Sequence, residues 1–198
     1  MDLLAELPKG EQADRVRAMV RRSAARMSEL IGNVLDLARG RLGGGLTLEP
    51  QPEDRLEGML TQVVLELEAT RPGRVVDREI RVDRPFVCDA PRLAQLLSNL
   101  VANALTHGDP DSPVRVRGRT SPDAFELSVA NRGETIPPEV IEGLFQPFFR
   151  GTVKPDREGL GLGLYIASEV ARAHSGALTV TSADSETTFT FRMPMTLG

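Results

Sequence analysis

Two asparagines share one face of a predicted helix, and this constrains the chain more than any other feature. Asn99 and Asn103 are four residues apart in the segment QLLSNLVANALTHG, where leucine, valine and alanine recur every three or four positions. This period predicts a helix over residues 90–107 with both carboxamides on the same side. Because an amide oxygen is a hard ligand of the kind that Mg²⁺ binds, the pair is a candidate magnesium site.

A run of alternating glycine and leucine follows further along the chain, at the predicted start of another helix. Glycine lets backbone N–H groups approach a phosphate closely, and the first N–H groups and the dipole of a helix favour anions. A helix with oxygen ligands and a phosphate-binding loop together predict a site for a magnesium nucleotide. The run consists of Gly159, Leu160, Gly161, Leu162, Gly163 and Leu164.

Each feature alone has a simpler interpretation, since asparagines on helices are usually solvated or capping residues and glycine-rich runs are usually turns. Two further segments decide between the interpretations. Residues 129–139 read VANRGETIPPE, and residues 144–150 read LFQPFFR. In this order the four segments resemble the N, G1, F and G2 boxes of the ATP-binding domain of bacterial sensor histidine kinases, over residues 50–195.

The resemblance implies an α+β fold, a two-layer α/β sandwich of the histidine-kinase/GHKL ATPase type, preceded by a long dimerisation helix. The residue periodicity agrees, because segments with the period of a helix and of a strand are mixed beyond residue 53. Helices are predicted at 12–41, 53–70, 90–107, 138–145 and 161–174, and strands at 46–49, 75–82, 86–88, 113–119, 124–131, 176–183 and 187–193.

The predicted helix over residues 12–41 carries a heptad-like apolar seam from Val16 to Leu37, which a lone helix cannot bury. It resembles the second helix of the family's dimerisation and phosphotransfer hairpin. We therefore expect a truncated hairpin over residues 1–45, an ATP-binding catalytic domain over residues 46–198, and a homodimer formed through helix 12–41.

The family's phosphoacceptor histidine lies on the first helix of that hairpin. The histidines of this chain are His107 and His174, and neither belongs to the hairpin. We therefore expect the chain to lack the phosphoacceptor and to contribute no catalytic residue of that kind.

The resemblance assigns the two asparagines to the phosphate end of the nucleotide. Asn103 is expected to ligate a Mg²⁺ ion that bridges the ATP phosphates, and Asn99 is expected to face those phosphates. The related ATPases, which include gyrase and the Hsp90 chaperone, carry a water-activating glutamate at the position of Asn99. Because an amide cannot take a proton from water near neutral pH, Asn99 favours phosphoryl transfer to an acceptor over hydrolysis.

The resemblance also assigns a group of residues to the adenine base. Asn131 stands where most of the family has an aspartate that accepts a hydrogen bond from the 6-amino group, and its amide oxygen can accept that bond without charge assistance. Because Thr135 also replaces a glycine, we expect weaker nucleotide binding than is usual for the family. Gly133 and Ile136 flank Asn131, and Thr187 is expected to lie near the base.

The end of the asparagine helix matches two further family positions. Thr106 lacks the positive charge that the family usually places there to contact phosphate. His107 either flanks the base or is a surface residue. His174 is expected to end the helix over residues 161–174, where the helix dipole favours a positive charge.

A lid over residues 150–158 is expected to cover the nucleotide. Phe148 is expected to anchor the hinge of this lid. Arg150, which ends the F box, either contacts phosphate or is solvated.

Composition excludes several classes of protein. With a net charge of −4, 4% aromatic residues and no tryptophan, the chain lacks the basic and stacking surfaces that bind nucleic acid. The single cysteine, Cys88, excludes an intramolecular disulfide and fits a cytoplasmic protein. No apolar stretch approaches the roughly 20 residues of a membrane span, so no membrane contact is expected from this chain, although a longer parent protein could be membrane-anchored.

The implied function is that of a protein-histidine kinase that uses ATP and Mg²⁺. The γ-phosphate passes to a histidine of the dimerisation domain and then to an aspartate on a response regulator receiver domain. Three alternatives stay open: a nucleotide-binding regulatory module without kinase activity, a GHKL-type ATPase, and an anti-sigma-factor serine kinase. The ATPase would need a carboxylate at position 99, and the hairpin-like helix argues against the serine kinase.

Overall fold

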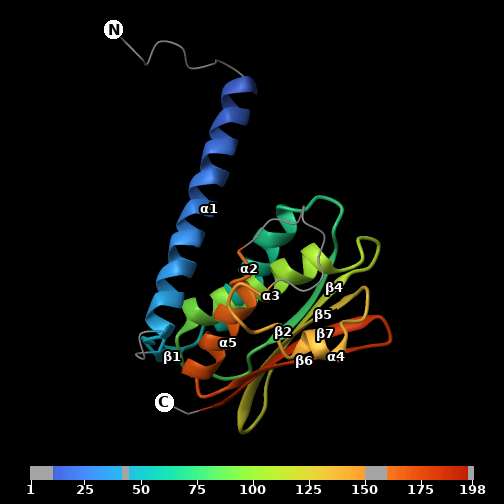
Figure 1. Ribbon diagram of the computed structural model, residues 1–198. Coiled ribbons are helices and arrows are strands. Elements are labelled where there is room, and N and C mark those ends of the chain that lie inside the picture. The colour runs from blue at the N-terminus through green and yellow to red at the C-terminus, as the bar shows by residue number, and fades with distance from the viewer. Residues whose placement is uncertain (1–10, 42–44, 150–159, 196–198) are drawn as a thin grey trace.

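A five-stranded mixed sheet forms one layer of the molecule. The computed structural model describes residues 11–41, 45–149 and 160–195 (Figure 1). The first two strands of the sheet, β2 and β4, are parallel, and the other neighbours are antiparallel. In spatial order the strands are β2 (Val76–Arg81), β4 (Val114–Thr120), β5 (Ala124–Arg132), β7 (Glu186–Pro194) and β6 (Ala177–Ala183).

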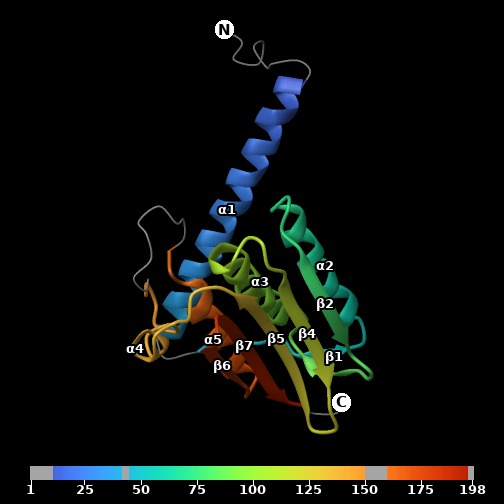
Figure 2. The ribbon, with the colours of Figure 1, turned by 90° about the vertical axis from the view of Figure 1, so that its right-hand side faces the viewer.

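Three helices form the second layer and cover one face of this sheet (Figure 2). A two-stranded ribbon, β1 with β3, and the short helix α4 complete this part of the molecule. The predicted two-layer α/β sandwich is confirmed. These elements are α2 (Leu56–Ala69), α3 (Ala90–His107), α5 (Gly163–Ala173), β1 (Gln51–Glu53), β3 (Phe86–Cys88) and α4 (Pro138–Ile141).

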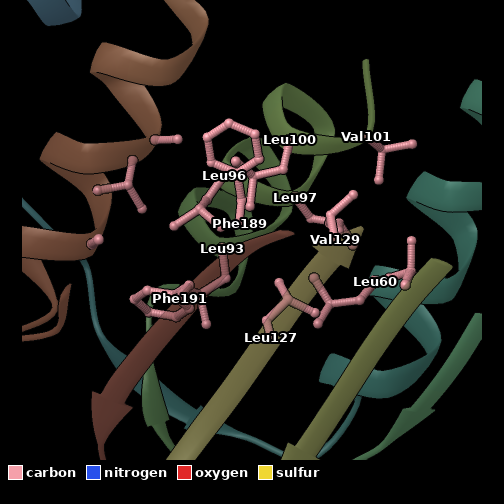
Figure 3. Close-up of a cluster of buried hydrophobic side chains, with 14 of the residues drawn as sticks. Leu60, Leu93, Leu96, Leu97, Leu100, Val101, Leu127, Val129, Phe189 and Phe191 are labelled. Atoms are coloured by element: carbon pink, nitrogen blue, oxygen red, sulfur yellow. The ribbon is translucent and has the colours of Figure 1, made fainter. Parts of the chain in front are cut away.

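The core lies between the two layers and is built largely around α3 (Figure 3). The leucines of α3 recur at the predicted spacing, are fully buried, and face apolar side chains of β5 and β7. Burial of each large side chain stabilises the fold by about 1.5–3 kcal/mol, so α3 is held firmly against the sheet. These residues are Leu93, Leu96, Leu97, Leu100, Leu127, Val129, Phe189 and Phe191.

The start of α3 is determined locally. The Asp89 side chain caps the helix by accepting a hydrogen bond from the Arg92 N–H at 3.1 Å. Pro91 occupies the first turn, where a backbone N–H has no partner within the helix. The predicted bounds of this helix are therefore correct at both ends.

The long helix α1 (Glu11–Arg41) extends away from the sandwich (Figure 1). The described side chains of its seam are exposed from Val16 to Val34, and Leu37, near the C-terminal end of the helix, belongs to the core. Within the described residues, no helix combines the length and the apolar character that crossing a membrane requires. The exposed apolar side chains of α1 are Val16, Met19, Val20, Met27, Ile31, Val34 and Leu35.

The predicted strand at residues 46–49 is wrong. The Leu46 side chain is buried, which explains the apolar alternation, but the Glu49 N–H donates to the Asp89 carboxylate at 2.9 Å instead of to a strand. The nearby strand is β1, which contains Pro52 and pairs only with β3. A proline is tolerated there because a strand paired on one side leaves the other side without a hydrogen-bonding partner.

His174 is the C-cap residue of α5, as the sequence predicted, but it is buried and neutral instead of carrying the positive charge that the helix dipole would favour. Its side chain is 7% exposed, Nε2 accepts a hydrogen bond from the Asp89 N–H at 3.2 Å, and Nδ1 lies 2.9 Å from the Val170 carbonyl. Because Nε2 accepts, Nδ1 carries the proton and donates to the carbonyl. Burial lowers the pKa of His174 below its usual value.

We predict that His174 makes stability depend on pH. Its lowered pKa in the folded state means that the unfolded chain binds the extra proton first, so stability is full above about pH 6.5 and falls below it. The slope from this one group is at most about 1.4 kcal/mol per pH unit. Urea unfolding between pH 8 and 5.5 should show a shallower decline for His174→Gln than for the wild type. Equal slopes would contradict a neutral buried histidine.

Candidate functional site

Asn99 lies against the start of α5. A Cβ placed on Gly163, the first residue of that helix, would be 3.3 Å from Asn99 Oδ1, so the glycine allows the two helices to approach. Asn99 Nδ2 is buried and has no hydrogen-bond partner among the residues that the structure describes. Buried donors are nearly always paired in folded proteins, so this amide is a candidate position for a ligand.

The N-terminus of α5 offers further donors at the same place. The N-cap residue, Leu162, makes no side-chain hydrogen bond to this helix, so within the described part of the chain the first backbone N–H groups are without a side-chain cap. The N-cap residue Leu162 has its side chain in the core, at 1% exposed, which leaves its backbone as the part that can meet a ligand. An uncapped helix start beside an unpaired amide donor is suited to bind an anion.

Asn103 lies one turn beyond Asn99 on the same side of α3 and is partly exposed. Within the described ranges, no group of three His, Cys, Asp or Glu side chains could hold a metal ion. A cation at this place would therefore depend on the Asn103 amide oxygen and on oxygens of its own ligand. This donor set fits Mg²⁺, which prefers oxygen and commonly shares its coordination sphere with nucleotide phosphates.

The F box and the glycine run meet at Gly161. Its φ is +69°, and a Cβ there would lie 2.8 Å from the Phe149 carbonyl oxygen. The Phe148 N–H donates to the Gly161 carbonyl at 3.0 Å. The two ends of the predicted lid are thus joined by backbone contacts that only glycine permits.

Phe148 has a left-handed backbone, with φ of 64°, and a side chain that is 54% exposed. In the glycine run, Leu160 is exposed whereas Leu164 packs against the core. Arg150 and Gly159 lie outside the described residues, as does the predicted lid between them.

Residues assigned to the base lie at one edge of the sheet, where β5 and β6 end and β7 begins. Asn131 and Thr187 are directly opposite each other in the β5–β7 register, and both are buried. Asn131 Nδ2 donates to the Arg132 carbonyl at 3.1 Å, so its Oδ1 is the atom left to accept a hydrogen bond from a ligand. The fold therefore brings together two residues that the sequence analysis assigned to the base separately.

Ser182 joins this group and was missed from the sequence. Its Oγ lies 2.8 Å from Thr187 Oγ1 and accepts a hydrogen bond from the Ile136 N–H at 2.9 Å. The two-residue turn between β6 and β7 has positive φ at both central positions, Asp184 and Ser185. Such a hairpin turn fixes the register and would have placed Ser182 opposite Thr187.

The C-terminal end of α3 closes this side of the site. A Cβ on Gly108 would be 3.0 Å from Asn131 Cβ and 3.2 Å from Nη2 of Arg74. The Arg74 guanidinium also donates to the Asp109 carbonyl, so it puts a positive charge at the helix end. This residue was not predicted from the sequence.

Thr106 and His107 are the last two residues of α3. Thr106 is partly exposed and His107 is exposed. A Cβ on Gly133 would lie 3.4 Å from the His107 carbonyl oxygen, so the G1 box and the end of α3 are in contact.

The profile of the family described as "Histidine kinase-, DNA gyrase B-, and HSP90-like ATPase" matches residues 88–197. This chain belongs to that ATPase family. The match includes α3, α5 and the strands that carry Asn131 and Thr187.

Curated relatives of this chain include proteins that are named as sensors. The bacteriophytochrome of Pseudomonas aeruginosa is 35% identical over 91% of this chain and 25% of its own length. The probable sensor histidine kinase TcrY of Mycobacterium tuberculosis is 34% identical over 86% of this chain and 36% of its own length. The sensor protein VanSC of Enterococcus gallinarum is 30% identical over 98% of this chain and 55% of its own length. The chain thus spans about a quarter to about half of these relatives.

Solved structures agree with this placement. The full-length ShkA in complex with AMPPNP superposes with a TM-score of 0.72 at 29% identity, over 96% of this chain and 40% of ShkA. The mycobacterial sensor histidine kinase MprB gives a TM-score of 0.64 at 25% identity, over 76% of this chain and all of the MprB chain. The prediction of a sensor-histidine-kinase catalytic domain is confirmed.

Proposed function

We propose that this chain binds ATP with Mg²⁺ and delivers the γ-phosphate to a histidine of a dimerisation hairpin. The observation that carries the nucleotide part is the buried, unpartnered Nδ2 of Asn99 beside the uncapped start of α5. Phosphate oxygens accept hydrogen bonds from both kinds of donor. The relative ShkA, whose structure contains AMPPNP, supports a nucleotide as the ligand.

The phosphates and the metal are assigned to the α3–α5 side of the site. Mg²⁺, held by the Asn103 amide oxygen, would supply neutralisation of the phosphate charge. Asn99 and the backbone of the glycine run orient the phosphates through N–H groups. Thr106 lies three residues after Asn103 on α3 and would contact the phosphates without a positive charge. The residues in this proposal are Asn99, Asn103, Thr106, Arg150, Gly159, Leu160, Gly161, Leu162, Gly163 and Leu164.

The adenine base is assigned to the strand ends. The free Oδ1 of Asn131 accepts a hydrogen bond from the 6-amino group, and Thr187 lies beside it. A guanine base would place its 6-oxo acceptor against the same oxygen, so adenine is favoured. Gly133, Ile136, His107 and Phe148 complete the residues that we assign around the base.

Transfer is favoured over hydrolysis because Asn99 occupies the place nearest the phosphates and cannot accept a proton from water. The chain's residues then act by holding the phosphates in a fixed position and orientation relative to the acceptor histidine. We propose that the hairpin phosphate passes on to a response regulator receiver domain, and that both transfers occur in the cytoplasm.

We predict that this chain transfers phosphate only in trans. His174 is buried with both ring nitrogens hydrogen-bonded, and His107 lies at the end of α3 within the same domain, so neither is a suitable acceptor. Mixed with MgATP and a separate dimerisation hairpin that carries an acceptor histidine, the chain should place acid-labile phosphate on the hairpin. A receiver domain added afterwards should take up that phosphate.

The control for this experiment is the hairpin with its acceptor histidine replaced by glutamine, which should stay unlabelled. Acid-labile phosphate on the 198-residue chain alone, or rapid release of inorganic phosphate without any hairpin, would contradict the proposal.

We also propose that α1 forms a homodimer. Its exposed apolar side chains, such as Met27 at 58% and Ile31 at 61%, form a surface that pairing would remove from water. Sedimentation should give a dimer that Met27→Asp and Ile31→Asp convert to a monomer. Leu65→Asp is the matched control, because Leu65 is also exposed but lies on α2. A wild-type chain that is monomeric at micromolar concentration contradicts this proposal.

A further inference from the structure

Three side chains connect α1 to the start of α3, and we name them the Asp36 clamp. The Asp36 carboxylate accepts hydrogen bonds from Arg92 Nη1 at 2.8 Å and from Gln95 Nε2 at 3.0 Å. Arg92 Nη1 also donates to Gln95 Oε1 at 2.8 Å, which closes the triangle. The clamp thus spans two elements that are far apart in the sequence.

Asp36 is the buried member of the clamp, whereas Arg92 and Gln95 are partly exposed. The Asp36 side chain is 5% exposed, whereas Val34 and Leu35, just before it, are 49% and 51% exposed. Removing a carboxylate from water costs several kcal/mol unless partners satisfy its oxygens. Asp36 is therefore stable at this position only when α1 and α3 keep the relative placement that brings Arg92 and Gln95 to it.

The same end of α3 also holds the segment that follows α1. Asp89 accepts the Arg92 N–H with one carboxylate oxygen and the Glu49 N–H with the other, at 3.1 and 2.9 Å. Both the end of α1 and the chain leaving it are thus attached to the first turn of α3. The helix then presents Gln95, Asn99 and Asn103 at four-residue spacing along one face, so the clamp and the proposed phosphate site share one rigid helix.

We propose that Asp36 is a positioning residue that fixes the angle between α1 and the ATP-binding sandwich. The clamp orients α3, and through α3 the Asn99 and Asn103 face, relative to the helix on which phosphotransfer depends. The importance of this angle for transfer rests on the proposed function, whereas the angle itself can be measured without any nucleotide.

The experiment measures the distance between two spin labels, one on each body. Ala24→Cys on α1 and Thr181→Cys on β6 give exposed label positions. Native Cys88 is 2% exposed and burial raises its pKa to about 12, so the labelling reagent should spare it. Labelled chains are diluted with unlabelled chains, so that distances within one chain dominate even in a dimer.

The wild type should give a single narrow distance distribution, and Asp36→Asn should broaden it at least twofold. Asp14→Asn is the matched control, because Asp14 pairs with Arg17 on the exposed surface of the same helix. The exchange Asp36→Arg with Arg92→Asp should restore a narrow distribution. This exchange also suits both helix dipoles, since it puts an acid in the first turn of α3 and a base near the end of α1.

An unchanged distribution in Asp36→Asn, or a broad one in the wild type, overturns the clamp. If Asp36→Asn fails to fold, Gln95→Leu provides the same test from the other side of the triangle. MgATP affinity, measured on the same variants, should stay within about twofold of the wild type, since none of the clamp residues is assigned to the nucleotide. Loss of nucleotide binding by the wild type would overturn the proposed function and leave the clamp result intact.

Discussion

Replacing Asn103 with alanine is expected to lower the affinity for MgATP about 10- to 100-fold, the range typical of a lost metal-site contact. The reason is that the Asn103 oxygen is the protein ligand available to the metal, since the described residues contain no acidic or histidine cluster that could replace it. Calorimetric titration with ATP in the presence of Mg²⁺ measures the change. Titration with ATP and a chelator should show a much smaller difference between variant and wild type.

The matched control for this substitution is Gln62→Ala. Gln62 is also an amide on a helix surface, but it lies on α2 and contacts Glu66. Its replacement should leave MgATP affinity unchanged. A folded Asn103→Ala protein with wild-type affinity would show that the metal is held elsewhere.

Replacing Gly161 with alanine is expected to reduce nucleotide affinity more than tenfold. The left-handed backbone at this glycine already disfavours a side chain by about 1–2 kcal/mol. In addition, the new Cβ would lie 2.8 Å from the Phe149 carbonyl oxygen and 3.1 Å from the Phe148 carbonyl carbon, so the glycine run must move away from the F box. The movement displaces the segment that leads into α5, where the phosphates are proposed to bind.

Gly73→Ala separates these two effects. Gly73 also has a positive φ, of +88°, but a Cβ there meets nothing within 4 Å. It should lower the melting temperature slightly and leave MgATP affinity at the wild-type value. Equal losses of affinity in the two variants would mean that backbone strain alone, and not the contact with the F box, disturbs binding.

The layers of this fold were predictable because the local signals agreed with one another. The segment around Asn99 has a strong three- and four-residue period, a capping Asp89 and a proline in its first turn, so its bounds were correct. The β6–β7 hairpin was likewise delimited by turn residues at Asp184 and Ser185. The strand predicted at residues 46–49 is absent because alternating apolar residues there do not reflect strand pairing. The backbone N–H of Glu49 donates to the Asp89 side chain instead.

The candidate site was predictable where sequence spacing determines geometry. Four-residue spacing on a helix is enough to place Asn99 and Asn103 together. The position of Thr187 opposite Asn131 depends on the pairing of β5 with β7, which spacing along the chain does not determine. Contacts between distant side chains were not predictable in this way. The sequence predicts Asp36 to be an ordinary polar residue on an exposed helix. Its partners Arg92 and Gln95 lie on α3, and no local pattern links them to Asp36.

The most direct test of the central claim is calorimetric titration of the wild-type chain with ATP, with and without Mg²⁺, and with GTP. We expect one saturable ATP site per chain that depends on Mg²⁺, and at least tenfold weaker binding of GTP, because its 6-oxo group faces the Asn131 amide oxygen. A folded chain that binds no ATP, or binds ATP and GTP equally and without regard to Mg²⁺, would contradict the assignment of Asn99, Asn103 and Asn131.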